Sequence, residues 1–273
     1  MEQTIPTIYV EDAFRTGKEC PICHLIERDE NRFLQTFFSE WIMEPSCRDK
    51  IINSRGFCRY HSYQILNYAD AHGEKLGLAL VLESFVNERL HTIEKLRKNS
   101  DSLIDLLRRN DLKSILERRL FGKNPESIRR LARKIVARLG HVEAQCPACL
   151  HLLESNASHV ETFIQMMVQS ETFNEVLKES KGFCLPHLVE VTQSASRRLD
   201  QRSFASVLKT LLPLQASSFT RIKFELSEFI VKHDYRFANE GFGSEVNVVE
   251  RGILKLIGTS HLGPISIQEG EFL

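Results

Sequence analysis

The chain has 273 residues, enough for one large domain or two smaller ones, and its 42% hydrophobic and 26% charged residues are typical of a globular protein. Lysine and arginine together number 36, as do aspartate and glutamate, so no net charge draws the whole chain to nucleic acid or to a membrane. The sequence opens without a basic segment followed by an apolar stretch, and no apolar run is long enough for a transmembrane helix, so we predict a cytoplasmic location.

Helices are predicted throughout, because apolar residues recur every three or four positions and few segments alternate with a period of two. An apolar stripe from Leu25 to Trp41 predicts a helix that ends before Pro45. Three further helices are predicted in the first half: one over residues 49–53, one from near His61 and a long one after Gly73. We therefore expect an all-α fold.

The second half repeats this plan. An apolar stripe from Val160 to Met167 is followed by a short helix over residues 171–178 and by a break at Gly182. A long helix over residues 202–231 contains Pro213, which should kink it. The two halves are thus predicted to be pseudo-repeated helical units.

Two copies of one four-ligand pattern dominate the sequence. The first copy joins Cys20-Pro21-Ile22-Cys23 to Gly56-Phe57-Cys58-Arg59-Tyr60-His61. The second copy joins Cys146-Pro147-Ala148-Cys149 to Gly182-Phe183-Cys184-Leu185-Pro186-His187, and each of its ligands lies 126 positions after its counterpart. One match could arise by chance, but two in the same register indicate a duplicated metal-binding unit.

This ligand spacing is typical of tetrahedral zinc sites. We predict two Zn²⁺ ions, one held by Cys20, Cys23, Cys58 and His61 and the other by Cys146, Cys149, Cys184 and His187. Because protein atoms fill all four positions, no place is left for water or substrate, which is typical of a structural site. Proline is tolerated at a first helical position, so the ligands should lie at helix starts, where free N–H groups stabilise thiolates.

Three alternatives to this assignment follow from the same residues. Cys20 and Cys23 could instead join Cys184 and His187, but closing the shorter loops within one copy costs less entropy. An iron–sulfur cluster is disfavoured, because its usual set of four cysteines is absent from each copy. An exchangeable or thiol-oxidisable zinc would make the same ligands a redox- or metal-responsive switch.

The connection between the two copies is strongly basic. Residues 97–138 carry 13 lysine and arginine residues against five acidic ones. One interpretation is an anionic partner, either nucleic acid or an acidic protein face. The other interpretation, which we favour, is packing against the acidic remainder of the chain, because net charge alone is a weak signal.

No phosphate-binding glycine loop, serine nucleophile motif, paired-carboxylate motif or open His-rich site appears in the sequence. The seventh cysteine, Cys47, lies outside the pattern and is interpreted as a small buried residue. The polar run from Lys232 to Phe237 is interpreted as a helix end that docks the tail. We therefore predict an interaction, scaffold or regulatory module with an unidentified protein partner, rather than an enzyme.

The duplicated Cys-Pro-x-Cys and Gly-Phe-Cys-x-x-His motifs, together with the stretch from Glu228 to Phe237, resemble an uncharacterised bacterial and archaeal family. Some of its members are labelled as ABC-transporter substrate-binding proteins, and others as a domain of unknown function. The resemblance covers roughly residues 5 to 245 and implies the metal sites, but no established activity.

The sequence predicts four parts. They are a first metal-binding repeat over residues 1–99, a basic helical connection over residues 100–140, a second metal-binding repeat over residues 141–240, and a C-terminal helix and tail over residues 241–273. In the last part, one helix near residues 245–257 should precede an irregular tail.

Overall fold

A computed structural model describes residues 4–108, 125–140, 145–234, 236, 241 and 243–259 of the protein. This part of the chain is helical and contains no β-strand, which confirms the predicted all-α fold. None of the described helices combines the length and the apolar character that crossing a bilayer requires.

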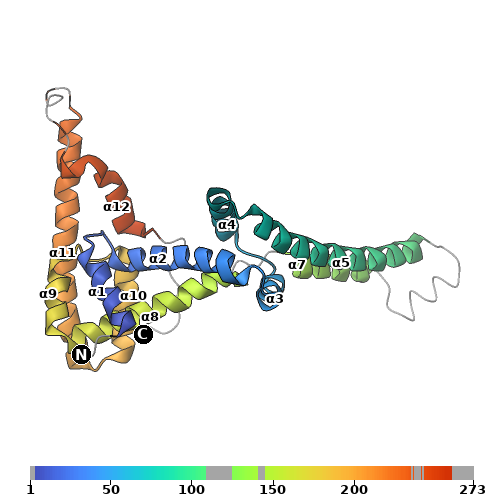
Figure 1. Ribbon diagram of the computed structural model, residues 1–273, viewed down its shortest axis with the longest axis horizontal. Helices are drawn as coiled ribbons and strands as arrows, with labels where there is room; N and C mark the ends of the chain where they lie inside the picture. The colour runs from blue at the N-terminus through green and yellow to red at the C-terminus, as the bar shows by residue number, and fades with distance from the viewer. Residues whose placement is uncertain are drawn as a thin grey trace. The chain divides into compact units, whose positions relative to one another are not determined.

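The helices follow one another in a simple order (Figure 1). They are α1 (Ile5–Arg15), α2 (Pro21–Thr36), η1 (Phe37–Trp41), α3 (Pro45–Asn53), α4 (Arg59–His72), α5 (Lys75–Arg108), α7 (Pro125–Leu139), α8 (Pro147–Gln169), α9 (Glu171–Glu179), α10 (Leu185–Arg198), α11 (Gln201–Lys232), η4 (Ser244–Asn247) and α12 (Val248–Ile257). The helices expected in each half are all present. Helix α1 was not predicted, and the C-terminal end of α2 widens into the π-helical turn η1.

Four pairs of helices begin 126 residues apart, which is the offset between the two ligand motifs. The pairs of first residues are Pro21 and Pro147 (α2 and α8), Pro45 and Glu171 (α3 and α9), Arg59 and Leu185 (α4 and α10), and Lys75 and Gln201 (α5 and α11). The two halves therefore share one order of helices in one register. Pro213 lies inside the continuous helix α11.

The chain folds into two compact units that do not coincide with its sequential halves. The first unit combines residues Met1–Arg32 with His151–Leu273, and the second unit is Phe33–Leu150. The divisions fall inside α2 and α8. These bounds differ from the predicted repeats, because each unit takes its Cys-Pro-x-Cys motif from one copy and its Cys-x-x-His motif from the other.

Aromatic side chains form the centre of the core in the first unit. Phe14, Phe163, Phe173 and Phe183 are almost fully buried. Their ring centroids lie 5.1–5.9 Å apart in stacked and edge-to-face pairs. Phe183 belongs to the Gly-Phe-Cys motif, so burial of this ring anchors the ligand-bearing loop to the core.

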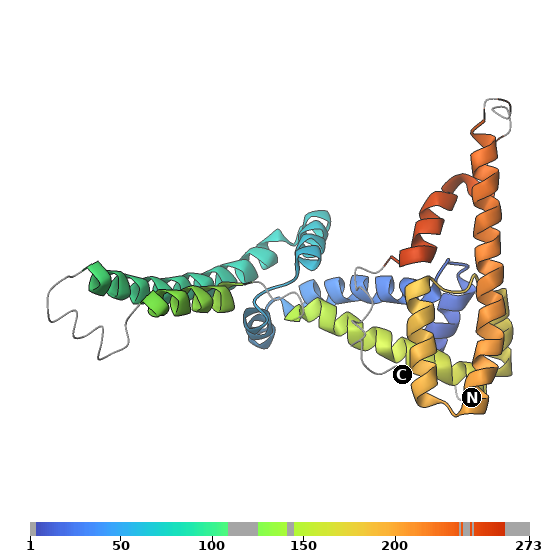
Figure 2. The same ribbon diagram turned by 180° about the vertical axis from the view of Figure 1, so that it is seen from behind.

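The second unit has its own core, to which the other Gly-Phe-Cys motif contributes in the same way. Phe33, Phe37 and Phe38 are buried there, and Phe57 packs its ring edge-on against Phe37 with centroids 5.7 Å apart. Helix α7 lies beside α5 in this unit, as both ribbon views show (Figures 1 and 2).

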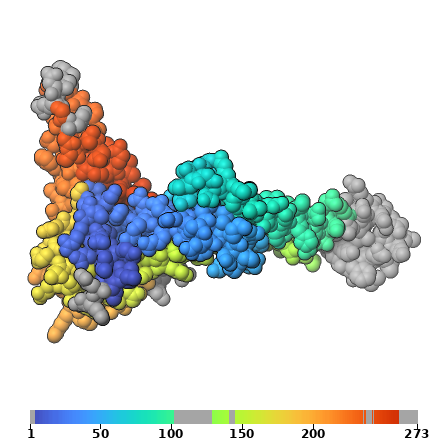
Figure 3. Space-filling view, viewed as in Figure 1, coloured from blue at the N-terminus to red at the C-terminus, as the bar shows by residue number. Residues whose placement is uncertain are grey.

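In the first unit, α12 packs against α11 and α10, and its red surface lies beside the orange surface of α11 in Figure 3. Its inner face carries Val248, Gly252 and Lys255, all buried. Its outer face is apolar and exposed; the residues are Val249, Ile253, Leu256 and Ile257.

Candidate metal centres

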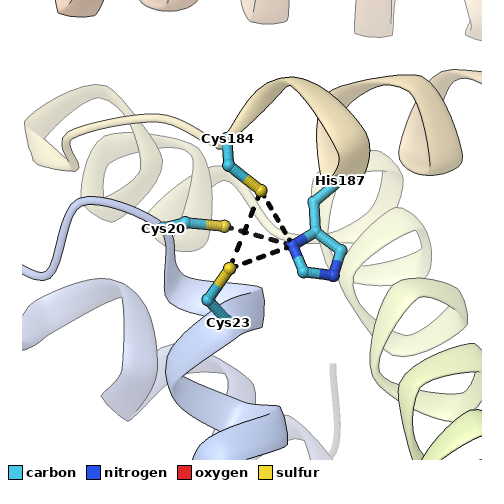
Figure 4. Close-up of side chains that lie close together, drawn as sticks. All are labelled: Cys20, Cys23, Cys184 and His187. Atoms are coloured by element: carbon cyan, nitrogen blue, oxygen red, sulfur yellow. Dashed lines mark hydrogen bonds between the residues drawn. The ribbon is translucent and has the colours of Figure 1, made fainter. Parts of the chain in front are cut away.

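Three cysteines and one histidine converge in the first unit and form what we term the first cluster: Cys20, Cys23, Cys184 and His187 (Figure 4). All four residues are buried. The Nδ1 atom of His187 lies 3.4 Å from the Sγ of Cys20, 3.3 Å from that of Cys23 and 3.1 Å from that of Cys184. The Sγ atoms of Cys23 and Cys184 are 3.7 Å apart.

The second unit holds an equivalent group, termed the second cluster: Cys58, His61, Cys146 and Cys149. The Nδ1 atom of His61 lies 3.2 Å from the Sγ of Cys58, 3.5 Å from that of Cys146 and 3.3 Å from that of Cys149. The Sγ atoms of Cys58 and Cys149 are 3.7 Å apart, as in the first cluster.

These distances match the edges of a tetrahedron around one metal ion. Zn–S bonds of about 2.3 Å and Zn–N bonds of about 2.0 Å at tetrahedral angles give S···S edges of about 3.8 Å and S···N edges of about 3.5 Å. In each cluster the four donor atoms all lie within 4.8 Å of one another. Both clusters could therefore hold a metal ion with little rearrangement.

The predicted pairing of the ligands within each motif copy is wrong. The first cluster joins Cys20 and Cys23 of the first copy to Cys184 and His187 of the second copy. The second cluster joins Cys146 and Cys149 of the second copy to Cys58 and His61 of the first copy. The structure thus has the exchanged arrangement that loop entropy had disfavoured.

Two physical reasons explain the exchange. The entropic preference for short loops is small: closing the 161 residues between Cys23 and Cys184 rather than the 35 between Cys23 and Cys58 costs only about 1.4 kcal/mol more. Helix lengths also oppose pairing within one copy. The helical run Pro21–Trp41 carries the chain about 30 Å from Cys20, whereas α3, the helix between that run and Cys58, spans only about 14 Å.

All eight residues of the two clusters lie at helix starts, as predicted. Cys20 and Cys146 directly precede α2 and α8, and Cys23 and Cys149 lie in their first turns. Cys58 and Cys184 are the N-cap residues of α4 and α10, and the Sγ of Cys58 accepts a hydrogen bond from the backbone N–H of His61. Free N–H groups and the helix dipole stabilise negative charge at these positions.

The loop that carries Cys184 is held from both sides. Gly182 has a φ of +71°, which an L side chain rarely adopts, and an added Cβ would lie 3.0 Å from Oε1 of Gln215. That same amide oxygen accepts a hydrogen bond from the Phe183 N–H at 3.0 Å, and the Gln215 Nε2 donates to the Phe183 carbonyl at 2.8 Å. Gln215 thereby fixes the backbone just before the ligand.

The thiols compete for protons in the first cluster. Burial and the neighbouring thiols raise the pKa of Cys20 well above its ordinary value, whereas hydrogen bonds with Cys184 and Cys20 lower the pKa of Cys23. Burial disfavours the charged ring of His187, but hydrogen bonds with Cys184 and Cys23 outweigh it and raise the pKa of His187 to about 10.

The second cluster behaves alike. Hydrogen bonding with Cys149 lowers the pKa of Cys146 to about 3, and the pKa of Cys149 is raised in turn, first by its hydrogen bond with Cys146. Three thiolates packed this closely would need a cation among them, which a metal ion could supply.

A buried lysine from α12 ties the two ligand loops of the first cluster together. Lys255 is fully buried, and its Nζ donates hydrogen bonds to the carbonyl oxygens of Glu19 at 2.5 Å, of Lys181, and of Phe183 at 3.4 Å. Glu19 precedes Cys20, and Phe183 precedes the ligand Cys184. Burial lowers the pKa of Lys255. One ammonium group therefore donates hydrogen bonds to carbonyl oxygens of both ligand-bearing loops of the first cluster.

The carboxylate of Glu19 is the centre of an ion-pair network beside this lysine. Arg221 lies 2.5 Å from Glu19, Arg251 3.4 Å and Lys181 3.7 Å, and both arginines also pair with Glu225. Burial would raise the pKa of Glu19, but the hydrogen bond from Arg221 and the nearby positive charges outweigh it and lower the pKa. The network places excess positive charge next to the first cluster, which would carry a net charge of −1 with a zinc ion bound.

The outer ring nitrogen of His187 faces a carboxylate. Its Nε2 lies 3.9 Å from Oε2 of Glu190, and Asn156 donates its side-chain N–H groups to both Glu190 oxygens at 2.7 and 2.9 Å. Carboxylates in this position orient histidine ligands and increase their basicity.

A comparison with family models decides how this chain is classified. The model of a family of unknown function, DUF6062, matches residues 1–262. The chain belongs to this family. The comparisons with curated proteins and with solved structures gave no significant match. The predicted resemblance to a domain of unknown function is thus confirmed, and the classification adds no activity.

One polar pair at the first unit's core was missed by the sequence analysis. His159 on α8 lies with its Nε2 2.6 Å from Oδ2 of Asp29 on α2, and both side chains are nearly buried. No sequence pattern links these two residues, which lie 130 positions apart.

The remaining predicted residues have plain structural roles. Cys47 lies partly buried on α3 against the core of the second unit. Lys232 donates to the Gly241 carbonyl and pairs with Glu245 at 2.5 Å, so this helix end docks the segment that leads into α12. Of the basic connection, residues 109–124 lie outside the described residues, as do Tyr235 and residues 237–240 of the polar run and residues 260–273 of the predicted irregular tail.

Proposed function

We propose that this protein is a zinc-binding scaffold or interaction module in which two structural ions each fix the fold of one unit. The observation that carries the proposal is the matched geometry of the two clusters, with S···N distances of 3.1–3.5 Å and S···S distances of 3.7 Å. Sulfur-rich sites with one imidazole select zinc among the common divalent ions.

The structural role follows from the number of ligands. Each cluster supplies four protein donors, so a tetrahedral ion would have no position for water or substrate. Structural zinc contributes about 10–16 kcal/mol in small domains, as much as the whole stability of a typical domain. Metal binding would therefore supply much of the folding free energy of each unit.

Two further observations concern the role as an interaction module and the cellular compartment. The apolar outer face of α12 is of the kind that interaction modules use, because soluble proteins seldom expose a continuous apolar face. The cysteines of the described residues form no disulfide and six of them lie in ligand sets, which suits a reducing compartment such as the cytoplasm.

Element analysis of the purified full-length protein tests this proposal. We expect two zinc ions per chain, and removal with a strong chelator should lower the thermal unfolding midpoint and the helical circular dichroism. The variant Cys47→Ser should keep both ions, since Cys47 belongs to neither cluster. A protein that carries no transition metal and unfolds at the same temperature with and without chelator would contradict the proposal.

Nucleic-acid binding through α7 is a second candidate function. The favouring observation is that this helix exposes five basic side chains on one side: Arg129, Arg130, Arg133, Lys134 and Arg138. Such a basic face is the electrostatic footprint of a protein that contacts phosphates.

Salt dependence distinguishes this candidate from simple solvation of a charged helix. Affinity for a generic duplex should fall steeply with salt, and replacing Arg129, Arg130 and Lys134 by Gln should make the slope shallower by roughly three. Replacing the exposed basic residues Arg197, Arg198 and Lys209 of the first unit by Gln serves as the control. Absence of duplex binding at low salt would contradict this candidate.

A further inference from the structure

The two clusters differ in how well they are shielded from solvent. In the first cluster every ligand is at most 5% exposed. In the second cluster Cys58, His61 and Cys146 are buried, but Cys149 is only partly buried. The second cluster therefore has one ligand residue that is partly open to solvent, whereas the first cluster has none.

The two clusters also differ in the charged side chains that surround them. Lys255 and the Glu19 network hold both ligand loops of the first cluster. In the second copy Gln145 replaces Glu19 before the first cysteine, so the centre of that network is missing. Among the described residues of the second unit, no lysine or arginine is buried. The second cluster is thus more open and, in the part of the chain that the structure describes, has no counterpart of the buried Lys255 and Glu19.

We propose that the second cluster is an oxidation site at which peroxide joins Cys58 and Cys149 in a disulfide and releases the metal ion, while the first cluster keeps its ion. This inference rests on the proposed function, because it requires an ion in each cluster. We take Cys58 as the partner because the Sγ of Cys149, the one partly buried ligand residue of the second cluster, lies 3.7 Å from the Sγ of Cys58.

The chemistry balances with peroxide as the only added reagent. The Cys149 sulfur attacks one peroxide oxygen, the O–O bond breaks, and the leaving hydroxide takes up a proton to become water. The Cys58 sulfur then attacks the resulting sulfenic acid, the S–O bond breaks, and a second hydroxide leaves as water. Two thiolates thus lose two electrons in total, and one peroxide is reduced to two waters.

The consequence for the metal follows from ligand loss. A disulfide removes two of the four donors from the second cluster, and His61 and Cys146 alone would hold zinc weakly. Reduction of the disulfide restores the donor set, so the release should be reversible. Buried ligands should delay the same reaction in the first cluster.

Peroxide titration of the zinc-loaded full-length protein tests the inference. Zinc release is followed with a colorimetric chelator, and disulfides are mapped by mass spectrometry at each dose. We expect one ion per chain to be released at low dose with a Cys58–Cys149 disulfide, and the second only at a dose at least tenfold higher. Thiol reductant should restore two ions per chain.

Two variants sharpen the test without removing a ligand. Cys47→Ser removes the other partly buried thiol of the second unit and should leave the early zinc release unchanged. Loss of the early release in this variant would mean that Cys47 is the reactive thiol, and it would overturn the proposal. Lys255→Met should bring the late release to a lower dose and leave the early one unchanged. If Lys255→Met shifted the early release instead, it would contradict the assignment of the early release to the second cluster and of the late release to the first.

The outcomes separate this inference from the proposed function. Two ions per chain before peroxide and unequal release afterwards support both. Two ions per chain with simultaneous release, with earlier release from the first cluster, or with a Cys146–Cys149 disulfide overturn the oxidation site alone. Purified protein without metal overturns the proposed function and the oxidation site together.

Discussion

The sulfur atoms of Cys23 and Cys184 lie 3.7 Å apart although 161 residues separate them in the sequence. This contact shows that the first cluster is assembled from the beginning of one motif copy and the end of the other. The second cluster uses the two remaining halves in the same way, with Cys58 and Cys149 also 3.7 Å apart. The first unit therefore cannot be completed before α10 has been synthesised.

Substitution of Gly182 should weaken the first cluster through its loop. Gly182→Ala forces a side chain into a left-handed conformation and towards the Gln215 amide, 3.0 Å away. We expect a loss of about 2 kcal/mol or more of unfolding free energy, together with weaker zinc binding in the first unit. Thermal unfolding and competition with a chelator measure the two effects.

Gly73→Ala is the matched control for this substitution. Gly73 has a similar φ of +74°, but nothing lies within 4 Å of an added Cβ. Only the backbone strain of about 1 kcal/mol should remain, without any change in zinc affinity. Equal effects of the two substitutions would show that contact with Gln215 is unimportant.

The pair formed by Asp29 and His159 should make stability depend on pH. Burial opposes ionisation of Asp29, but the hydrogen bond with His159 outweighs it and lowers the pKa of Asp29 in the folded state. The stabilisation is therefore present above the unfolded pKa of about 3.9 and is lost as the pH falls through the lower folded value. Asp29→Asn should cost about 2 kcal/mol at pH 7, and the difference should shrink below about pH 4.

Asp70→Asn tests whether removal of any paired aspartate has this effect. Asp70 pairs with Lys75, but both side chains are more than half exposed, so the change should stay within about 0.5 kcal/mol at every pH. Denaturant unfolding at pH 7 and pH 3.5 gives both comparisons. A pH-independent difference between the wild type and Asp29→Asn would contradict the role given to the carboxylate.

Loss of Glu190 should affect the first cluster alone. Its carboxylate faces Nε2 of His187 at 3.9 Å and is fixed by Asn156. Glu190→Ala should weaken zinc binding at this cluster by about tenfold to a hundredfold, as is usual when a carboxylate behind a histidine ligand is removed. Gln64 holds the matching position in the first copy, and Gln64→Ala is the control that should leave the first cluster unchanged.

The sequence predicted the fold class and the identity of the clustered residues well, because both depend on local patterns. Apolar periodicity located α9 and α11 to within one residue at each end. The duplicated spacing identified all eight residues that meet in the two clusters. Proline at the first position of α2 and α8 correctly placed the cysteines at helix starts.

Local patterns could not predict which Cys-x-x-Cys motif pairs with which Cys-x-x-His motif. They also could not predict which distant side chains support the resulting clusters. Each motif half has the same internal spacing, Cys-x-x-Cys or Cys-x-x-His, in both copies, so only the packing of whole helices distinguishes the two pairings. Lys255 lies 236 positions from Glu19, and nothing in the sequence marks a lysine on an amphipathic helix as fully buried. A single sequence provides no signal for such distant contacts.

The zinc content of two double variants tests the exchanged pairing most directly. Cys23 and Cys184 belong to one cluster, whereas Cys23 and Cys58 belong to different clusters. Each of the single variants Cys23→Ser, Cys58→Ser and Cys184→Ser should retain one zinc ion per chain. The double variant Cys23→Ser with Cys184→Ser should also retain one ion, and Cys23→Ser with Cys58→Ser should retain none. The reverse result, with no ion in the first double variant and one in the second, would contradict the structure and restore pairing within each copy.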